Sequence, residues 1–219
     1  MTINEKLNNE INNNHFRVAI FGSARIKKGH LVYNKIYSLA HMIAEQNIDV
    51  VTGGGPGLME AASAGHKAGR KKAGVHSVGL NILLPKEQYA NKHLDIKKDF
   101  HKFSERLDYF MVLSNCVVVA PGGIGTLLEL FYTWQLIQVK HICNIPIILL
   151  GKEWPGLIKW IKSWALRNKL IDKEDLNSLF FADTSEEAMG IIKIAHDHFK
   201  KDGKYTCLNY KKYVLNDEA

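Results

Sequence analysis

A glycine-rich turn in the middle of this 219-residue chain limits the folds open to it. Residues 116–120, CVVVA, have the composition of a buried parallel strand, and residues 121–129, PGGIGTLLE, follow directly. Apolar residues then recur at helical spacing through Leu130 and Trp134. The sequence therefore predicts a strand, a glycine turn and a helix in immediate succession.

The same succession occurs twice upstream. Residues 17–21, RVAIF, precede a turn of glycine and small residues at 22–25, GSAR, and the short strand-like segment 48–51, IDVV, precedes the turn TGGGPG at 52–57. Further helices are expected over 31–46, 58–69, 102–114, 154–166 and 185–200, and further strands over 74–80, 93–100, 145–150 and 178–182. Alternating strands and helices predict an α/β fold, a Rossmann-like doubly wound parallel sheet flanked by helices.

The composition, 46% hydrophobic, fits a single domain with a sizeable core. We expect a polar leader over 1–15, one Rossmann-like domain over 16–201 and a C-terminal tail over 202–219.

The leader lacks the apolar segment of a signal peptide, and no apolar run is long enough to span a bilayer. Three widely spaced cysteines, Cys116, Cys143 and Cys207, indicate neither a disulfide framework nor a zinc site. A cytoplasmic protein is therefore expected.

The net charge of +7 and the pI near 9.2 suit a nucleic acid or a small anionic substrate. Basic residues interleave with acidic ones along the chain and form no single block or stripe with interleaved aromatics. The ten histidines show no metal-ligand spacing, so no metal site is expected. The charge pattern favours a small anionic ligand.

The turn that starts at Pro121 suits a phosphate group. Glycine carries no Cβ, so a ligand can approach the backbone closely, and the unpaired N–H groups that open the next helix attract anions. The predicted phosphate-binding residues are Gly122, Gly123, Ile124, Gly125 and Thr126. Neither the dinucleotide-binding pattern nor the phosphate-binding loop with its lysine is present, which favours a mononucleotide or a sugar phosphate.

Glu129 lies one helical turn beyond Thr126, so its carboxylate can project back toward the ligand. A carboxylate repels a phosphate, and this makes Glu129 a candidate for work on a neutral or cationic part of the ligand. The alternative is that Thr126 and Glu129 form a capping box that only closes the helix.

Taken together, these motifs resemble the LOG ("lonely guy") family. The resemblance rests on GSAR at 22–25, GGGPGLMEA at 53–61, GLNI at 79–82 with LP at 84–85 and EQ at 87–88, and PGGIGT at 121–126 with Glu129. It implies a phosphoribohydrolase without a cofactor that cleaves cytokinin riboside 5′-monophosphates, and often AMP, to the free base and ribose 5-phosphate. Residues 16–201 would be its nucleotide-binding catalytic domain. An older label of this family is lysine decarboxylase, but the sequence shows no lysine in a pyridoxal-phosphate-binding context.

The resemblance also implies a catalytic pair, Glu129 and Arg106, the latter within FSERLDYF at 103–110. The family has a lysine after this arginine, whereas this chain has Leu107. Arg106 has a structural alternative, an ion pair with Glu105 or Asp108 on a solvated face. The expected nucleotide-binding residues are Gly22, Ser23, Gly54, Gly55, Glu60 and Asn81.

Two other functions stay open. A non-catalytic carrier of a nucleotide or of the molybdenum cofactor would bind tightly without releasing a base, and a nucleic-acid-binding module would show strongly salt-dependent affinity.

The helix over 127–137 is apolar nearly all round and predicts a subunit interface. With the resemblance it implies a homodimer or a multiple of dimers. AMP or an N6-modified AMP is the expected substrate, with neither nucleic acid nor a membrane as a partner.

Overall fold

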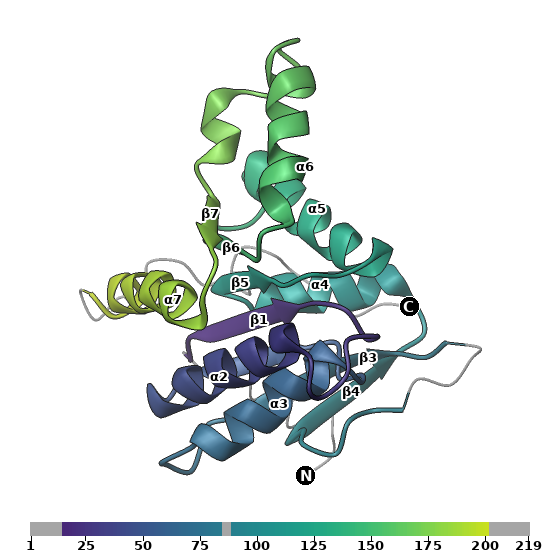
Figure 1. The fold of residues 1–219 in the computed structure, drawn as a ribbon, viewed down its shortest axis with the longest axis vertical. Coiled ribbons are helices and arrows are strands. Elements are labelled where there is room, and N and C mark those ends of the chain that lie inside the picture. Colours follow the sequence, from purple (N-terminus) through teal and green to yellow (C-terminus); the bar gives the residue numbers. More distant parts are fainter. Residues whose placement is uncertain (1–14, 85–88, 202–219) are drawn as a thin grey trace.

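The structure is a computed structural model, and it describes residues 15–84 and 89–201. Apart from His15, the predicted leader and the predicted tail lie outside these residues. One domain is seen in the described part of the chain, with helices on both faces of a central sheet (Figure 1). None of the helices within these ranges is both long and apolar enough to cross a membrane.

Seven parallel strands form the sheet in the order β4-β3-β2-β1-β5-β6-β7. The strands are β1 (Arg17–Phe21), β2 (Asp49–Thr52), β3 (Ser77–Ile82), β4 (Ile96–Phe100), β5 (Cys116–Val119), β6 (Ile147–Leu150) and β7 (Leu179–Ala182). The chain builds outward from β1 to β4 and then returns to place β5 beside β1. This order confirms the predicted Rossmann-like doubly wound sheet, whose connections reverse direction between β1 and β5.

Six α-helices cover the two faces of the sheet in the described residues. They are α2 (Leu31–Glu45), α3 (Leu58–Gly69), α4 (Phe103–Leu113), α5 (Ile124–Gln138), α6 (Trp154–Ile161) and α7 (Ser185–Lys200). Strand residues alternate between two apolar layers: Val18 and Ile20 pack with α2, α3 and α7, while Ala19 and Phe21 pack with α4, α5 and α6. The strands are therefore buried on both sides, as their continuous apolar runs predicted.

Three local features differ from the sequence expectations. β3 begins at Ser77 and extends through Asn81 to Ile82, whereas the expected strand covered 74–80. The helix expected over 154–166 is α-helical only to Ile161 and continues as a π-helical segment, Lys162–Leu166. A 3-10 helix, Lys173–Leu176, precedes β7 and had no prediction.

The cysteines also differ from expectation. Cys116 is a free thiol inside β5, and burial raises its pKa. Cys143 is disulfide-bonded, which the wide spacing of the cysteines had not indicated. The chain therefore contains one inert buried thiol and one oxidised cysteine among the described residues.

Candidate active site

The two residues expected to form the catalytic pair, Arg106 and Glu129, meet in the structure. Arg106 lies on α4 and Glu129 on α5, and Nη2 of Arg106 donates a hydrogen bond of 2.9 Å to Oε1 of Glu129. Only 7% of Arg106 and 8% of Glu129 is exposed. A charge-assisted contact between two largely dehydrated groups fixes both side chains in one arrangement.

The capping-box alternative for Glu129 does not hold. Helix α5 begins at Ile124, its N-cap is Gly123, and no side chain caps it. Thr126 is therefore the third residue inside the helix, and the Glu129 carboxylate bonds to another helix. The sequence pattern matched a capping box only because Thr and Glu are three residues apart.

The local alternative for Arg106 does not hold either. Glu105 pairs instead with Lys102 at 3.4 Å, and Asp108 accepts a hydrogen bond from the hydroxyl of Tyr132. Arg106 points into the protein, where its charge faces Glu129. Leu107, which replaces the family's lysine, is buried and adds no second positive charge.

Burial shifts the pKa values of both members of this pair. It raises the pKa of Glu129 to about 7, although the positive charge of Arg106 acts in the opposite direction. Burial likewise lowers the pKa of Arg106, and Glu129 opposes that shift. For Glu129, desolvation therefore outweighs the ion pair. The carboxyl group therefore changes charge near neutral pH, as acid–base groups in active sites commonly do.

Arg106 also has an unused donor. Its Nε is buried and has no hydrogen-bond partner within the described residues. Buried donors are nearly always paired, so an unpaired guanidinium N–H needs an acceptor from outside the chain. A hydroxyl or phosphoryl oxygen of a ligand would supply one.

The three glycine turns lie together because β1 has β2 and β5 as its neighbours. Ser23 joins them through its backbone: its N–H donates to Pro121 O at 3.1 Å, and its carbonyl accepts from the N–H of Leu58 at 3.0 Å. Gly57 has a φ of +70°, and a Cβ there would lie 2.5 Å from Ser23 O. Only glycine therefore fits this crossing. The Ser23 hydroxyl accepts from the N–H of Arg25 and closes its own turn.

The turn at 53–57 lies beside the ion pair. A Cβ on Gly53 would come within 3.5 Å of Nη1 of Arg106, so this guanidinium is next to the turn that follows β2. Asn91 holds the turn from the other side, because its N–H donates to Gly54 O at 2.8 Å and its side-chain amide donates to Gly54 O and Gly55 O at 3.1 Å. Sequence reasoning missed Asn91, which lies more than thirty residues from the glycines and joins them only in the fold.

The turn at 121–125 combines a packed glycine with open ones. A Cβ on Gly122 would lie 2.1 Å from Oγ1 of Thr126, so the buried Thr126 packs against this glycine. Gly123 and Gly125 have no protein atom within 4 Å of a Cβ position, and Ile124 is 82% exposed. The backbone at 123–125 therefore faces open space at the start of α5, where an anion is favoured.

Two of the expected nucleotide-binding residues, Asn81 and Glu60, have partners other than the pair. Asn81 donates from its side-chain amide to Asp99 at 2.9 Å, between β3 and β4. Glu60 lies in the first turn of α3, where its charge adds to burial in raising the pKa of Tyr33. Neither residue hydrogen-bonds to Arg106 or Glu129. Within the described residues, no group of three His, Cys, Asp or Glu side chains is placed to hold a metal ion.

This fold and this arrangement define a class, a Rossmann-like protein with glycine turns and a buried Arg–Glu pair at the carboxyl edge of its sheet. Residues 59–192 match the model of the family described as possible lysine decarboxylase, which covers more than half of the chain. The chain therefore belongs to this family, which is the LOG family that its motifs resemble.

Individual proteins are also similar to this chain in sequence or in fold. Over 139 residues the chain is 31% identical to the pyrimidine/purine nucleotide 5′-monophosphate nucleosidase of Escherichia coli K12, a match that covers 57% of this chain and 30% of that enzyme. The chain thus spans about a third of this curated relative's length. Its fold resembles the molybdenum cofactor binding protein of Rippkaea orientalis, with 21% identity, a TM-score of 0.61 and coverage of 82% of this chain and 96% of that one.

The molybdenum cofactor carrier protein of Chlamydomonas reinhardtii is similar to the same degree. It is 21% identical, with a TM-score of 0.61, and the match covers 84% of this chain and 99% of that one. At this identity the two structures support the fold and not the activity.

Proposed function

We propose that the chain is a nucleoside 5′-monophosphate phosphoribohydrolase that hydrolyses the N-glycosidic bond of AMP or of cytokinin riboside 5′-monophosphates. The products would be the free base and ribose 5-phosphate. The observation that carries the proposal is the buried Arg106–Glu129 pair beside the glycine turns. The printed name of the Escherichia coli relative, a nucleosidase for nucleotide 5′-monophosphates, supports the same reaction class.

The chemistry calls for a carboxylate. As the base leaves, positive charge builds on the ribose ring, and a carboxylate near C1′ stabilises this oxocarbenium-like state and orients or deprotonates the attacking water. Glu129 is the residue proposed for this role. Its low exposure strengthens the effect, because a charge in a region of low dielectric is screened little by water.

The remaining residues would bind and orient the nucleotide. The amides at 123–125 would hold the 5′-phosphate, so that binding of a group that does not react fixes the ribose relative to Glu129. Arg106 would offer its free Nε–H to an oxygen of the substrate while Nη2 keeps Glu129 in place. Ser23, Gly54 and Gly55 would form the neighbouring wall. Glu60 and Asn81 would contact the base or the ribose.

The decarboxylase activity in the family description is not part of this proposal. Lysine decarboxylation through pyridoxal phosphate needs a lysine that forms a Schiff base with the cofactor. The candidate pair, Arg106 and Glu129, contains no primary amine for this bond.

We further propose that the protein is a homodimer or a multiple of dimers. Ile124, Leu128 and Phe131 follow each other along α5 and are exposed, and Trp160 and Trp164 stack on one another nearby with rings 5.9 Å apart. Phe131 and Trp160 line the same cavity, so the two groups form one apolar surface. An exposed apolar surface of this kind suits a subunit interface.

A cytoplasmic location belongs to the same proposal, since the substrate is a metabolite nucleotide. The disulfide at Cys143 would be unusual in this location, because structural disulfides are rare in a reducing cytosol.

The proposal is tested by incubating the protein with the common nucleoside 5′-monophosphates and, separately, with the matching unphosphorylated nucleosides. Chromatography should show free base and ribose 5-phosphate from one or more monophosphates and far less base from the nucleosides. Tight binding of a nucleotide without base release would favour a carrier. Salt-dependent binding of polynucleotide with no base release would favour a nucleic-acid-binding module.

A further inference from the structure

A cavity of about 430 Å³ lies at the edge of the sheet opposite the glycine turns. Its lining includes residues that immediately precede four strands: Phe16 before β1, Asn115 before β5, Pro146 before β6 and Ser178 before β7. The C-terminal half of α7 covers it through Ile194 and Phe199. Its volume falls within the range of small-molecule sites.

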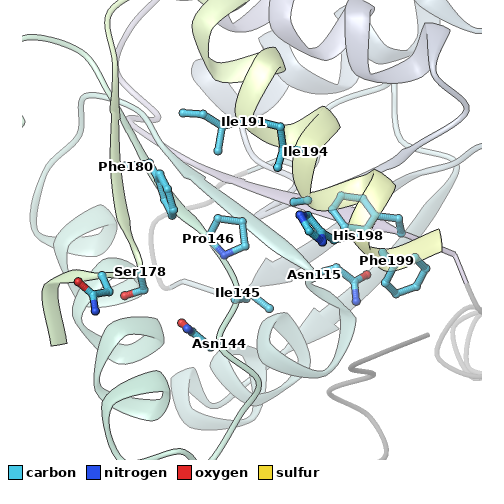
Figure 2. A pocket seen from close by; sticks show the side chains of 13 residues that line it. Asn115, Asn144, Ile145, Pro146, Ser178, Phe180, Ile191, Ile194, His198 and Phe199 are labelled. Atoms are coloured by element: carbon cyan, nitrogen blue, oxygen red, sulfur yellow. The ribbon is translucent and has the colours of Figure 1, made fainter. Parts of the chain in front are cut away.

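Most of the cavity surface is apolar. Figure 2 shows Phe180, Pro146, Ile191 and Ile194 in the middle of the view, between polar side chains on either side. Among the described residues that line it, none is Asp, Glu, Lys or Arg. His198 is the single described lining residue that can carry a charge, so an ionised ligand would lose its hydration here for at most one opposite charge, and the lining favours an uncharged ligand.

Two buried polar groups in the lining have unused hydrogen-bonding capacity. Ser178 is 4% exposed, and its hydroxyl has no hydrogen-bond partner within the described residues. Asn115 is also buried; its Oδ1 accepts the N–H of Arg17 at 3.0 Å, which leaves the side-chain amide as a donor. A buried unpaired hydroxyl costs stability unless a ligand or a water satisfies it.

The form of the ligand follows from these groups. Aromatic rings such as Phe16 and Phe180 offer faces or edges to another ring, and the hydroxyl and the amide offer hydrogen bonds to ring nitrogens or exocyclic groups. We propose that this cavity is a binding site for an uncharged heteroaromatic small molecule, separate from the candidate active site. The inference does not depend on the proposed hydrolase activity.

The test uses the full chain and two probes that are uncharged at neutral pH, adenine and benzimidazole, with benzoate as a charged probe of similar size. Calorimetric titration should show saturable binding of at least one uncharged probe and none of benzoate. Amide chemical shifts should change at residues around the cavity, such as Phe16, Ser178 and Ile191. Shifts confined to the turns at 22–25, 53–57 and 121–126 would place the probe at the candidate active site and overturn the proposal.

Two substitutions give the site-specific readout. Ala195→Phe places a ring in the cavity from α7 and should abolish binding. Ser178→Ala should weaken binding by about three- to tenfold, the effect of one hydrogen bond. Ser77→Ala is the matched control, because Ser77 is another buried serine with an unpaired hydroxyl, in β3 and away from the cavity. Absence of saturable binding by the wild type, or binding that Ala195→Phe leaves unchanged, would refute the site.

Discussion

Glu129 is the residue on which the proposed chemistry depends, and its surroundings give it two properties at once. The bond from Arg106 fixes its position, while burial raises its pKa to about 7. A carboxyl group with this pKa is partly protonated at neutral pH and becomes fully ionised as the pH rises. Base release should therefore depend on pH in the range where Glu129 loses its proton.

Replacing Glu129 by Gln keeps the shape of the side chain and an oxygen for Arg106, but it removes the negative charge. Binding of AMP should be largely retained, while the rate of base release should fall by orders of magnitude, because charge stabilisation of the transition state is lost. The rate is measured by chromatography of the released base and the affinity by titration. Glu105→Gln is the control, since Glu105 lies next to Arg106 in sequence but pairs with Lys102. Equal turnover of both variants would remove Glu129 from the mechanism.

Gly123 allows a direct test of the proposed phosphate site. A side chain there would meet no protein atom within 4 Å of its Cβ, so Gly123→Val should fold normally while filling the space in front of the turn. Nucleotide binding should be abolished, as measured by titration, with an unchanged thermal midpoint. Gly190→Val is the matched control, because the space around Gly190 on α7 is also open. Nucleotide binding by the Gly123 variant at wild-type affinity would show that the phosphate lies elsewhere.

At the scale of the elements, the reversal of the sheet between β1 and β5 assembles the site. The turns that follow β1, β2 and β5 come together because these three strands are neighbours, and Ser23 connects them through backbone hydrogen bonds. Helix α5 is common to both proposals. Its first turn follows the glycine turn at 121–125, and its outer face is apolar and exposed. The proposed site and the proposed subunit interface are thus parts of one helix.

Phe131 tests the interface. Placing Glu on this 41% exposed position would put a charge in the middle of the apolar surface on α5 and α6, where it would lose hydration in a dimer. Light scattering with size-exclusion chromatography should show a dimer for the wild type and a monomer for Phe131→Glu. Leu31→Glu, on the exposed start of α2 across the sheet, should leave the assembly unchanged. A variant that stays dimeric would place the interface on another surface.

At the scale of the whole molecule, buried titratable groups govern stability against pH. Burial lowers the pKa of His66 from 6.5 to about 4, and burial together with Lys200 lowers that of His196 to about 4. The unfolded chain therefore takes up protons at both histidines as the pH falls from about 6.5 toward 4, whereas the folded chain does not. The stability they contribute is present above about pH 6.5 and is lost as the pH falls.

Glu129 acts with the opposite sign. Its folded pKa of about 7 exceeds the ordinary 4.5, so the folded chain takes up this proton first and gains stability as the pH falls. Two histidines outweigh one carboxyl group, and the thermal midpoint should be lower at about pH 5 than at about pH 7.5. In Glu129→Gln the decrease should be steeper, because the opposing group is gone. Calorimetry over this range checks both; a shallower decrease in the variant would contradict the assigned shift.

Much of the fold could be predicted because its signals are local. The apolar run 116–120, the glycine turn after it and the helix that follows are contiguous in the chain, and their order led directly to β5 and α5. The predicted limits of β3 were less accurate. Asn81 is a polar residue type that is uncommon in buried strands, and its stabilising bond to Asp99 in β4 forms only in the fold. The disulfide at Cys143 likewise has no local signal.

The sequence by itself determined the succession of strands, turns and helices, since backbone preferences and burial patterns act over a few neighbouring residues. Only the tertiary structure decided that Arg106 faces Glu129 instead of Glu105 or Asp108, that Asn91 holds the turn at 53–57, and that burial brings the pKa of Glu129 close to neutrality. These outcomes depend on which strands become neighbours and on how much water is excluded between the helices. Both are properties of the assembled molecule, because hydrogen bonds and desolvation act through space between residues far apart in the chain.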